Sequence, residues 1–538
     1  MTRRDAVLAK NGLVASAHPL ASLAGVNILQ RGGNAVDAAL AMALVTNVVL
    51  PNMCGPGGDA FIILHHASTR ETVAINGSGK SPLRARPEYY LNLGYQSMPL
   101  DGLLSVAVPG AVDAYFQVHR MFGTRPMTEL VKPALDYARN GFPVTPKLSR
   151  EIGEARGKLS ASPAAARIFL RDGEPLKPGD LLRQADLGET LSTIASGGPE
   201  VFYRGEIARA IVQFSQRNGG LLEGEDLAGQ RSEVYEPLRT TYRGFEVRQT
   251  APPSQGFMVL EALNILEGYD LAGLGAGSPA VIHRMVESKK LVYADRLRYA
   301  GDPSFVKFPL RGLLHKGYAA RQREKIDESR VLTGEMEGQP WPFDGDTTYF
   351  AVVDREGNAV SFIHSLSHSF GSGVVVEGTG ILLNNRAGRG FTLEEGHPNR
   401  LAPGKRTMHT LNCWMILQDG HPVYVGGTPG GDGQPQWNVQ LITSLIDFGM
   451  TPQEAVEFPR WTSFPGTDPA QVKSLAELRL EERFPLDVTR ELKRRGHPVT
   501  MQGPWAGGGG AQIIKLDRER GLLEGGSDPR VEGLALGF

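Results

Sequence analysis

The chain has 538 residues, enough for three or four ordinary domains or for one large layered domain. Its 57 basic and 58 acidic side chains leave a net charge of -1, so no overall field favours nucleic acid or an anionic membrane as a partner. Glycine and proline, 66 and 36 residues, together make about 19% of the chain against roughly 12% in ordinary proteins. This excess needs an explanation.

Cysteine content and the N-terminal sequence bear on the compartment. Two cysteines, Cys54 and Cys413, cannot build a disulfide framework or a four-thiolate metal site. Asp5 and Lys10 interrupt the apolar stretch that a signal peptide needs, and the apolar part of residues 38–58 is too short to cross a bilayer. We therefore expect a cytoplasmic protein without a membrane partner.

The N-terminal part predicts a helical hairpin followed by two strands. Residues 20–31 carry apolar side chains at helical spacing, and the two glycines that follow end the helix. Asn34 is placed to cap a second helix. A glycine-rich loop then leads into two apolar strands, at residues 59–67 and 71–77.

The rest of the chain divides by composition near residue 346. Helical patterns dominate residues 111–271, and a long helix is expected at 279–299. From residue 347 the sequence becomes rich in β-branched and aromatic residues, beginning with a hairpin that turns at 355–358. We therefore expect a helix-rich segment, 1–346, and a strand-rich segment, 347–538, that together form one unit.

Two short motifs suggest functions that the surrounding sequence does not favour. Residues 71–82 resemble a phosphate-binding loop, but Ala74 replaces its first glycine and Pro82 begins the expected helix poorly. A nucleotide hydrolase would need Lys80 for ATP binding. His364 and His368 have the spacing of a helical zinc pair but lie in a strand-like alternation. We predict no metal and no cofactor.

A small nucleophile stands at the start of the strand-rich segment. Thr347 follows a polar connector, and a threonine becomes a strong nucleophile when its own backbone amine is free to act as a base. That requires cleavage between Asp346 and Thr347. Downstream, the glycine-rich residues 426–433 can present several backbone N–H groups to an oxyanion. The alternatives are an ordinary strand start and an ordinary tight turn.

Several stretches spread over the chain form one ordered pattern. They are SAHPLASLAGVNILQRGGNAVDAALA at 16–41, VAVPGAVDAY at 106–115, APPSQGFMVLEALNILEGYDL at 251–271, KLVYADRLRYAGDPSFVK at 290–307, DTTYFAVVDREGNAV at 346–360, FGSG at 370–373, GILLNNR at 380–386, GGTPGGDGQPQ at 426–436 and SDPR at 527–530. Together they resemble the gamma-glutamyltransferase family of N-terminal nucleophile hydrolases.

The resemblance implies an αββα sandwich, a four-layer fold made as one precursor that cuts itself into chains of 346 and 192 residues (538 less 346). It also implies that the two chains stay associated, while a homodimer remains an open question. In this family the N-terminal threonine, here Thr347, attacks the substrate amide, and its α-amine carries the proton. Gly430 and Gly431 match the oxyanion pair, Ser365 matches a hydroxyl that bonds to the nucleophile, and Thr348 follows it as expected.

The acyl-binding positions depart from the glutamyl pattern. Ser78 stands where glutamyl enzymes place an arginine, and Arg386 and Arg389 occupy the stretch where those enzymes carry an acidic residue for the α-amine. The residues that the resemblance places around the substrate are Arg386, Arg389, His409, Thr410, Ser367 and Thr348.

Two arginines favour an acyl group that carries a carboxylate and no α-amine, because guanidinium groups bind carboxylates through two parallel hydrogen bonds. Arg386 is the leading candidate for that contact. Oxamate amidohydrolases and cephalosporin (glutaryl) acylases depart from the glutamyl pattern in a comparable way. Alternatively, the two arginines form ion pairs with Glu394 or Glu395. At the level of function, the alternatives are a glutathione hydrolase or transferase and an unprocessed, non-catalytic binding protein, since Tyr349 and Ala351 differ from the usual start of the small chain.

Overall fold

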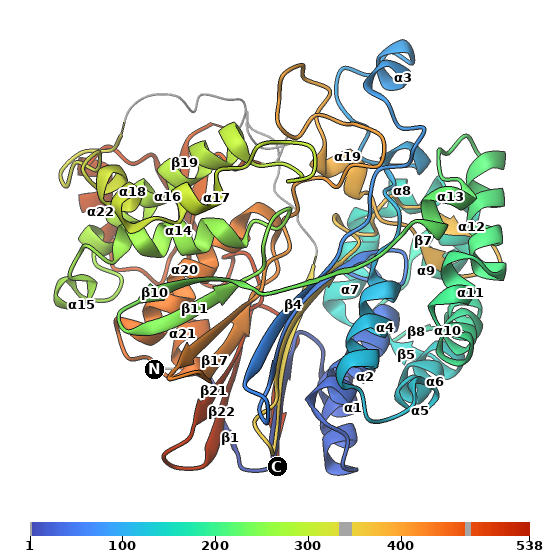
Figure 1. Cartoon of the computed structure of the whole chain (residues 1–538), viewed down its shortest axis with the longest axis horizontal. Helices are drawn as coiled ribbons and strands as arrows, with labels where there is room; N and C mark the ends of the chain where they lie inside the picture. Colours follow the sequence, from blue (N-terminus) through green and yellow to red (C-terminus); the bar gives the residue numbers. More distant parts are fainter. Residues whose placement is uncertain (1–2, 333–346, 468–474) are drawn as a thin grey trace.

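The computed structural model describes residues 3–332, 347–467 and 475–538, which contain two seven-stranded antiparallel sheets (Figure 1). The first sheet has the strand order β1 (Val7–Ala9), β22 (Leu522–Ser527), β21 (Gln512–Asp517), β17 (His421–Gly427), β16 (Trp414–Gln418), β11 (Phe245–Gln249) and β10 (Leu238–Tyr242). The second has the order β23 (Leu534–Gly537), β2 (Gly12–Ser16), β12 (Thr348–Asp354), β13 (Ala359–Ser365), β3 (Asp59–His66), β4 (Glu71–Gly77) and β9 (Glu233–Tyr235).

Helices cover the outer face of each sheet. The principal ones are α1 (Pro19–Gln30), α2 (Ala35–Val49) and α4 (Ala111–Phe122) beside the second sheet, and α14 (Gly256–Leu266), α16 (Pro279–Tyr299) and α20 (Gln434–Ile446) beside the first. Farther out on the side of the second sheet lie α6 (Lys132–Asn140), α10 (Ala185–Gly197) and α12 (Glu206–Arg217). One apolar core lies between the sheets, and another lies between each sheet and its helices. The predicted αββα sandwich is confirmed. In the described part of the chain, no helix has the length and apolar character needed to cross a membrane.

The predicted helical hairpin is confirmed almost to the residue. The side chain of Asn34 accepts a hydrogen bond from the backbone N–H of Asp37, and the Asp37 carboxylate accepts one from the backbone N–H of Asn34, so the pair caps the start of α2. The long predicted helix is α16, which begins where Ser278 caps it and Pro279 occupies the first turn. Such caps explain why these boundaries could be predicted.

Helices dominate residues 111–271, as predicted, but strands of both large sheets also lie in this range. They are β9, β10 and β11, of which β9 forms one edge of the second sheet and β10 one edge of the first. Edge strands are partly exposed and carry charged residues, as in LRTTY of β10, so they lack the apolar run of a central strand. They therefore gave no clear strand signal.

Both sheets combine strands from either side of residue 347. In the first, β10 and β11 precede this position and β16 follows it; in the second, β12 lies between β2 and β13. A cut before Thr347 therefore leaves two pieces that share both sheets.

A buried carboxyl pair in this fold yields a test of stability. Glu261 of α14 is fully buried, and no hydrogen-bond donor among the described residues reaches its carboxylate oxygens. Burial, and then the neighbouring Asp295 carboxylate, raise the pKa of Glu261 well above its ordinary value. The stability that the protonated form contributes is present below pH 4.5 and is lost as the pH rises towards the raised pKa.

We therefore expect Glu261→Gln to stabilise the protein at pH 8 by about 1–3 kcal/mol, because glutamine keeps the shape without the penalty of a buried charge. Thermal melts of both proteins at pH 8 and pH 5 check this. The gain should shrink at pH 5. A lower Tm for the variant at pH 8 would show that the carboxyl makes a favourable interaction instead.

Candidate active site

Thr347 lies at the end of the space between the two sheets. It immediately precedes β12, where Tyr349 and Ala351 point into the core between the sheets. Because side chains alternate along a strand, Thr347 is expected on the same inner face. It is 1% exposed, and its Oγ1 donates a hydrogen bond to Ser365 Oγ over 3.0 Å.

The pairing of strands β13 and β3 places Ser365 and Asp59 next to each other. Ser365 ends β13 and is the register partner of Asp59, which begins β3. The backbone N–H of Ser367 donates to Ser365 Oγ over 2.8 Å, so this hydroxyl group is fixed beside the hydroxyl of Thr347. The sequence prediction that Ser365 contacts Thr347 agrees with this geometry.

The glycine loop comes from the other sheet. It follows β17, and both Gly430 and Gly431 have positive φ angles, +123° and +52°. A Cβ atom on Gly430 would lie 2.1 Å from the ring of Trp437, and one on Gly431 would lie 2.2 Å from the guanidinium of Arg389. Glycine is therefore required at Gly430, where the rigid indole ring leaves no room, and is favoured at Gly431 by the positive φ. Within the described residues, neither backbone N–H has an acceptor, which leaves both available for an oxyanion.

Helices α14 and α16 hold this loop in place. Gln255, just before α14, donates to the Gly431 carbonyl over 3.0 Å. From α16, Arg296 forms an ion pair with Asp432, and the Tyr293 hydroxyl donates to the Asp432 carbonyl. A loop with such buried anchors keeps its N–H groups oriented without reorganisation, as oxyanion stabilisation requires.

Asp59 is a functional candidate that the sequence prediction missed. One carboxylate oxygen accepts hydrogen bonds from Arg386 Nε (3.2 Å) and His409 Nε2 (3.1 Å), and the other accepts from the backbone of Gly79 (2.9 Å). Burial alone would raise the pKa of Asp59, but the hydrogen bond from His409 and the charge of Arg386 hold it below its ordinary value. The available signal was an acidic residue that opens an apolar strand after a glycine-rich loop.

The ion pair between Arg386 and Asp59 contradicts the alternative in which the arginines pair with Glu394 or Glu395. Arg386 is 1% exposed and pairs with Asp59, whereas Glu394 and Glu395 are exposed. The prediction considered only nearby sequence, and the partner comes from a strand more than 300 residues away. The positive charge of Arg386 is therefore largely offset by a carboxylate.

Arg389 lies closer to the glycine loop. It belongs to the short helix α19 (Arg386–Gly390), is 1% exposed, and donates from Nη1 to the Ser367 carbonyl over 2.8 Å. Ser367 has a positive φ of +92°, a conformation that costs about 1–3 kcal/mol in a non-glycine residue and that clusters at functional sites. The buried Ser367 hydroxyl has no partner among the described residues.

His409 and Thr410 lie beside Arg386, as predicted. Thr410 Oγ1 accepts a hydrogen bond from Arg386 Nη1 over 3.4 Å. Burial and then the charge of Arg386 lower the pKa of His409 to about 4, so its imidazole is neutral near pH 7. Thr348 differs: Phe350 and Val352 of the same strand face point into the helix-side core, so Thr348 points away from Thr347. Its substrate contact stays a prediction, which the direction of the side chain does not support.

A cavity of about 380 Å³ opens at Thr347 and Gly430. Its wall includes Lys147 and Arg150 of α7 (Pro146–Glu154), together with Trp505. The charged side chains of the wall are Lys147, Arg150, Arg479, Arg530 and Glu151. Arg386 and Arg389 do not line it, so the cavity and the two arginines flank the glycine loop separately.

The two weak sequence motifs have no functional geometry. The segment before Lys80 leads into no helix until Pro87, and the Gly79 N–H is used by Asp59. His364 bonds to Thr46 and Tyr115 on the helix side of the sheet, whereas His368 contacts Asn385, so the pair does not converge. The predicted cleavage residue Asp346 lies outside the described residues.

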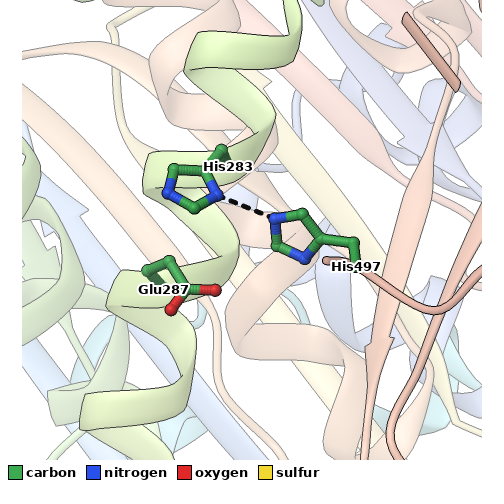
Figure 2. A group of neighbouring side chains, drawn as sticks. All are labelled: His283, Glu287 and His497. Carbon is green, nitrogen blue, oxygen red and sulfur yellow. Dashed lines mark hydrogen bonds between the residues drawn. The ribbon is translucent and has the colours of Figure 1, made fainter. Parts of the chain in front are cut away.

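A separate cluster of possible metal ligands lies on α16 (Figure 2). His283 and Glu287, one turn apart, both point towards His497 in the turn between α22 (Leu486–Arg494) and β20 (Val499–Gln502). Burial lowers the pKa of His283, and burial also lowers that of His497, to about 3.

The described residues thus bring together a buried threonine at a strand start, a hydroxyl group at its Oγ1 and a glycine loop whose two N–H groups have no acceptor among those residues. These are the features expected of an N-terminal nucleophile hydrolase. Comparison with known proteins agrees. The chain belongs to the gamma-glutamyltranspeptidase family, whose model matches residues 21–538.

The names of individual relatives describe different activities. The chain is 40% identical over 534 residues to a glutathione hydrolase-like proenzyme, YwrD, of Bacillus subtilis, covering 99% of each chain. It is 34% identical over 538 residues to the oxamate amidohydrolase proenzyme of Klebsiella pneumoniae, covering 98% of each. The crystal structure of a cephalosporin acylase from Bacillus halodurans superimposes with a TM-score of 0.92 at 36% identity, covering 100% of this chain and 98% of that one. The protein is thus a hydrolase of this family.

Proposed function

We propose that the chain cuts itself between Asp346 and Thr347 and then hydrolyses amides of a small acyl group that carries a carboxylate. The observation that carries the substrate assignment is the position of Arg389, buried and packed against Gly431 of the glycine loop. A carboxylate on the acyl chain would meet this guanidinium while its carbonyl faces the loop.

The first step is an attack of the Thr347 hydroxyl oxygen on the Asp346 carbonyl carbon. The peptide C–N bond breaks, an ester to Thr347 forms, and the nitrogen takes up a proton as the α-amine. Water then hydrolyses the ester and releases the Asp346 carboxylate. The names of two relatives include the word proenzyme, which supports such processing.

In the second reaction the same hydroxyl attacks the substrate. The Thr347 α-amine takes the hydroxyl proton, the carbonyl oxygen becomes an oxyanion, and the N–H groups of Gly430 and Gly431 stabilise it. The C–N bond then breaks as the amine leaves with that proton. Water attacks the acyl ester, restoring the threonine and releasing a carboxylic acid. No step needs a metal or an organic cofactor.

The acyl pocket disfavours a glutamyl α-ammonium group. Asp59 already accepts three hydrogen bonds from Gly79, Arg386 and His409, so its carboxylate offers little to a further cation. Arg389 would repel the ammonium group. A glutaryl or oxamate-like acyl group lacks that charge.

The competing candidate is a gamma-glutamyl hydrolase acting on glutathione, which the 40% identity to a glutathione hydrolase-like protein favours. A panel of anilides that differ only in the acyl group separates the two. We expect glutaryl-anilide to be hydrolysed with a higher kcat/KM than γ-glutamyl-anilide. Oxamate is assayed beside the two anilides. Faster hydrolysis of the γ-glutamyl compound or of glutathione would overturn the acyl assignment.

The contact between Ser365 and the nucleophile predicts a positioning effect. Ser365→Ala removes the acceptor of the Thr347 hydroxyl, so kcat should fall by about 10- to 100-fold, because misplacement of a reacting group has effects of this size. Ser365→Thr keeps a hydroxyl and should retain most activity. Steady-state kinetics on fully cleaved protein measures this, and equal activity of the alanine variant would remove Ser365 from the mechanism.

A further inference from the structure

The cluster of His283, Glu287 and His497 is separate from the residues assigned to catalysis. One potential ligand atom of each residue lies within 4.8 Å of those of the other two, and all three side chains are buried. His283 Nδ1 and His497 Nε2 are 2.8 Å apart. Figure 2 shows the three side chains converging on one point beside α16.

One hydrogen bond prepares His283 for metal binding. Its Nε2 lies 2.7 Å from the backbone carbonyl of Asp327, which can only accept, so Nε2 carries the proton. The lone pair of Nδ1 is therefore directed towards His497. A hydrogen bond from the second ring nitrogen to a carbonyl is the common way in which proteins orient a metal-binding histidine.

The carboxylate of Glu287 has acceptor positions that its present hydrogen bonds do not use. Its oxygens accept hydrogen bonds from Lys290 Nζ and from the backbone of Leu332, each over 2.7 Å. A carboxylate has about four acceptor positions, so these two bonds leave room for a cation. Lys290 is 27% exposed at its side chain and can turn towards solvent, which would relieve its repulsion of the ion.

We propose that His283, Glu287 and His497 form a binding site for a divalent transition-metal ion, with zinc as the best match. Two imidazoles and one carboxylate are a set that zinc accepts in tetrahedral geometry, with a water molecule as fourth ligand. The two nitrogens must separate by about half an ångström to share one zinc ion at Zn–N distances of about 2.1 Å. A solvent-accessible cavity of about 590 Å³, lined in part by His497, provides an entry path.

The site would join the two parts of the chain. His283 and Glu287 precede residue 347 and His497 follows it, so one ion would link the segments that cleavage separates. Asp327 and Leu332, which bond to the ligands, belong to the last described residues before position 333. The role as a link between chains rests on the proposed cleavage, whereas metal binding itself does not.

Cobalt(II) added to metal-free protein is the direct probe. We expect visible d–d absorption of a tetrahedral cobalt site that saturates at one ion per molecule and is displaced by zinc. Thr347→Ala protein should give the same spectrum, because it tests binding without cleavage. If the wild-type protein gave no such spectrum, the site would be disproved whatever the catalytic result.

Variants locate the ion. Glu287→Gln and His497→Gln keep polar groups of similar size, and each should weaken zinc binding at least roughly tenfold by removing a ligand. They should also abolish the rise in Tm that zinc gives the wild-type protein. His421→Ala, a partly exposed histidine outside the cluster, is the matched control and should behave as wild type. Unchanged zinc affinity in both cluster variants, or loss in the control alone, would place the ion elsewhere.

Discussion

Thr347→Ala should migrate as a single band of about 58 kDa on a denaturing gel, whereas the wild-type protein should give two bands. The reason is chemical: alanine has no hydroxyl to attack the Asp346 carbonyl, so the amide-to-ester step cannot begin. Hydrolysis of any anilide should fall to the uncatalysed level in the same variant. Intact mass spectrometry checks the first result and an anilide assay the second.

Thr347→Ser is the matched control for this variant. Serine retains the hydroxyl, so cleavage and activity should both persist, although more slowly. Edman degradation of the smaller wild-type band should start at Thr347. Two bands from the alanine variant would show that cleavage, if it occurs, uses another group, and an uncut wild-type protein would favour the non-catalytic binding protein instead.

Arg389→Gln should lower kcat/KM for glutaryl-anilide by about 30-fold or more, because loss of a buried charge partner costs about 2 kcal/mol or more. The same change should leave γ-glutamyl-anilide hydrolysis almost unaltered or raise it, since the repulsion of the α-ammonium group is removed. The ratio of the two kcat/KM values is therefore the decisive quantity. Steady-state kinetics on both substrates provides it.

Two controls separate binding from structure. Arg389→Lys keeps the charge but loses the two-pronged geometry and should give an intermediate ratio. Arg167→Gln removes an exposed arginine that pairs with Glu377 and should leave kcat/KM unchanged for both substrates. An equal loss on both anilides in Arg389→Gln, with a lowered Tm, would mean that Arg389 only supports the Ser367 backbone.

The main catalytic geometry could be anticipated because the sequence resembles a known family. A threonine at a strand start and a glycine loop are visible as local patterns, whereas the roles of Ser365, Gly430 and Gly431 came from the resemblance. The glycine excess also has a structural reason at two positions, since a side chain at Gly430 would collide with the ring of Trp437 and one at Gly431 would be strained by the positive φ. These constraints are encoded in short stretches of chain.

The acyl side could not be predicted in the same way, because its partners are distant in sequence. Asp59 and Arg386 are separated by 327 positions, and only the pairing of β3 with β13 brings Asp59 to the site. The orientation of Thr348 likewise follows from strand alternation relative to two cores, which the sequence alone does not place. Edge strands β9 and β10 were missed because half-exposed strands lack an apolar pattern.

Mass spectrometry of a rapidly acid-quenched reaction tests the central claim most directly. With glutaryl-anilide in excess, the chain that begins at Thr347 should gain the mass of one glutaryl group, and fragmentation should place the adduct on Thr347 itself. Arg389→Gln should accumulate less of it. An adduct on any other residue, or none during active turnover, would contradict the assignment of Thr347 as the nucleophile.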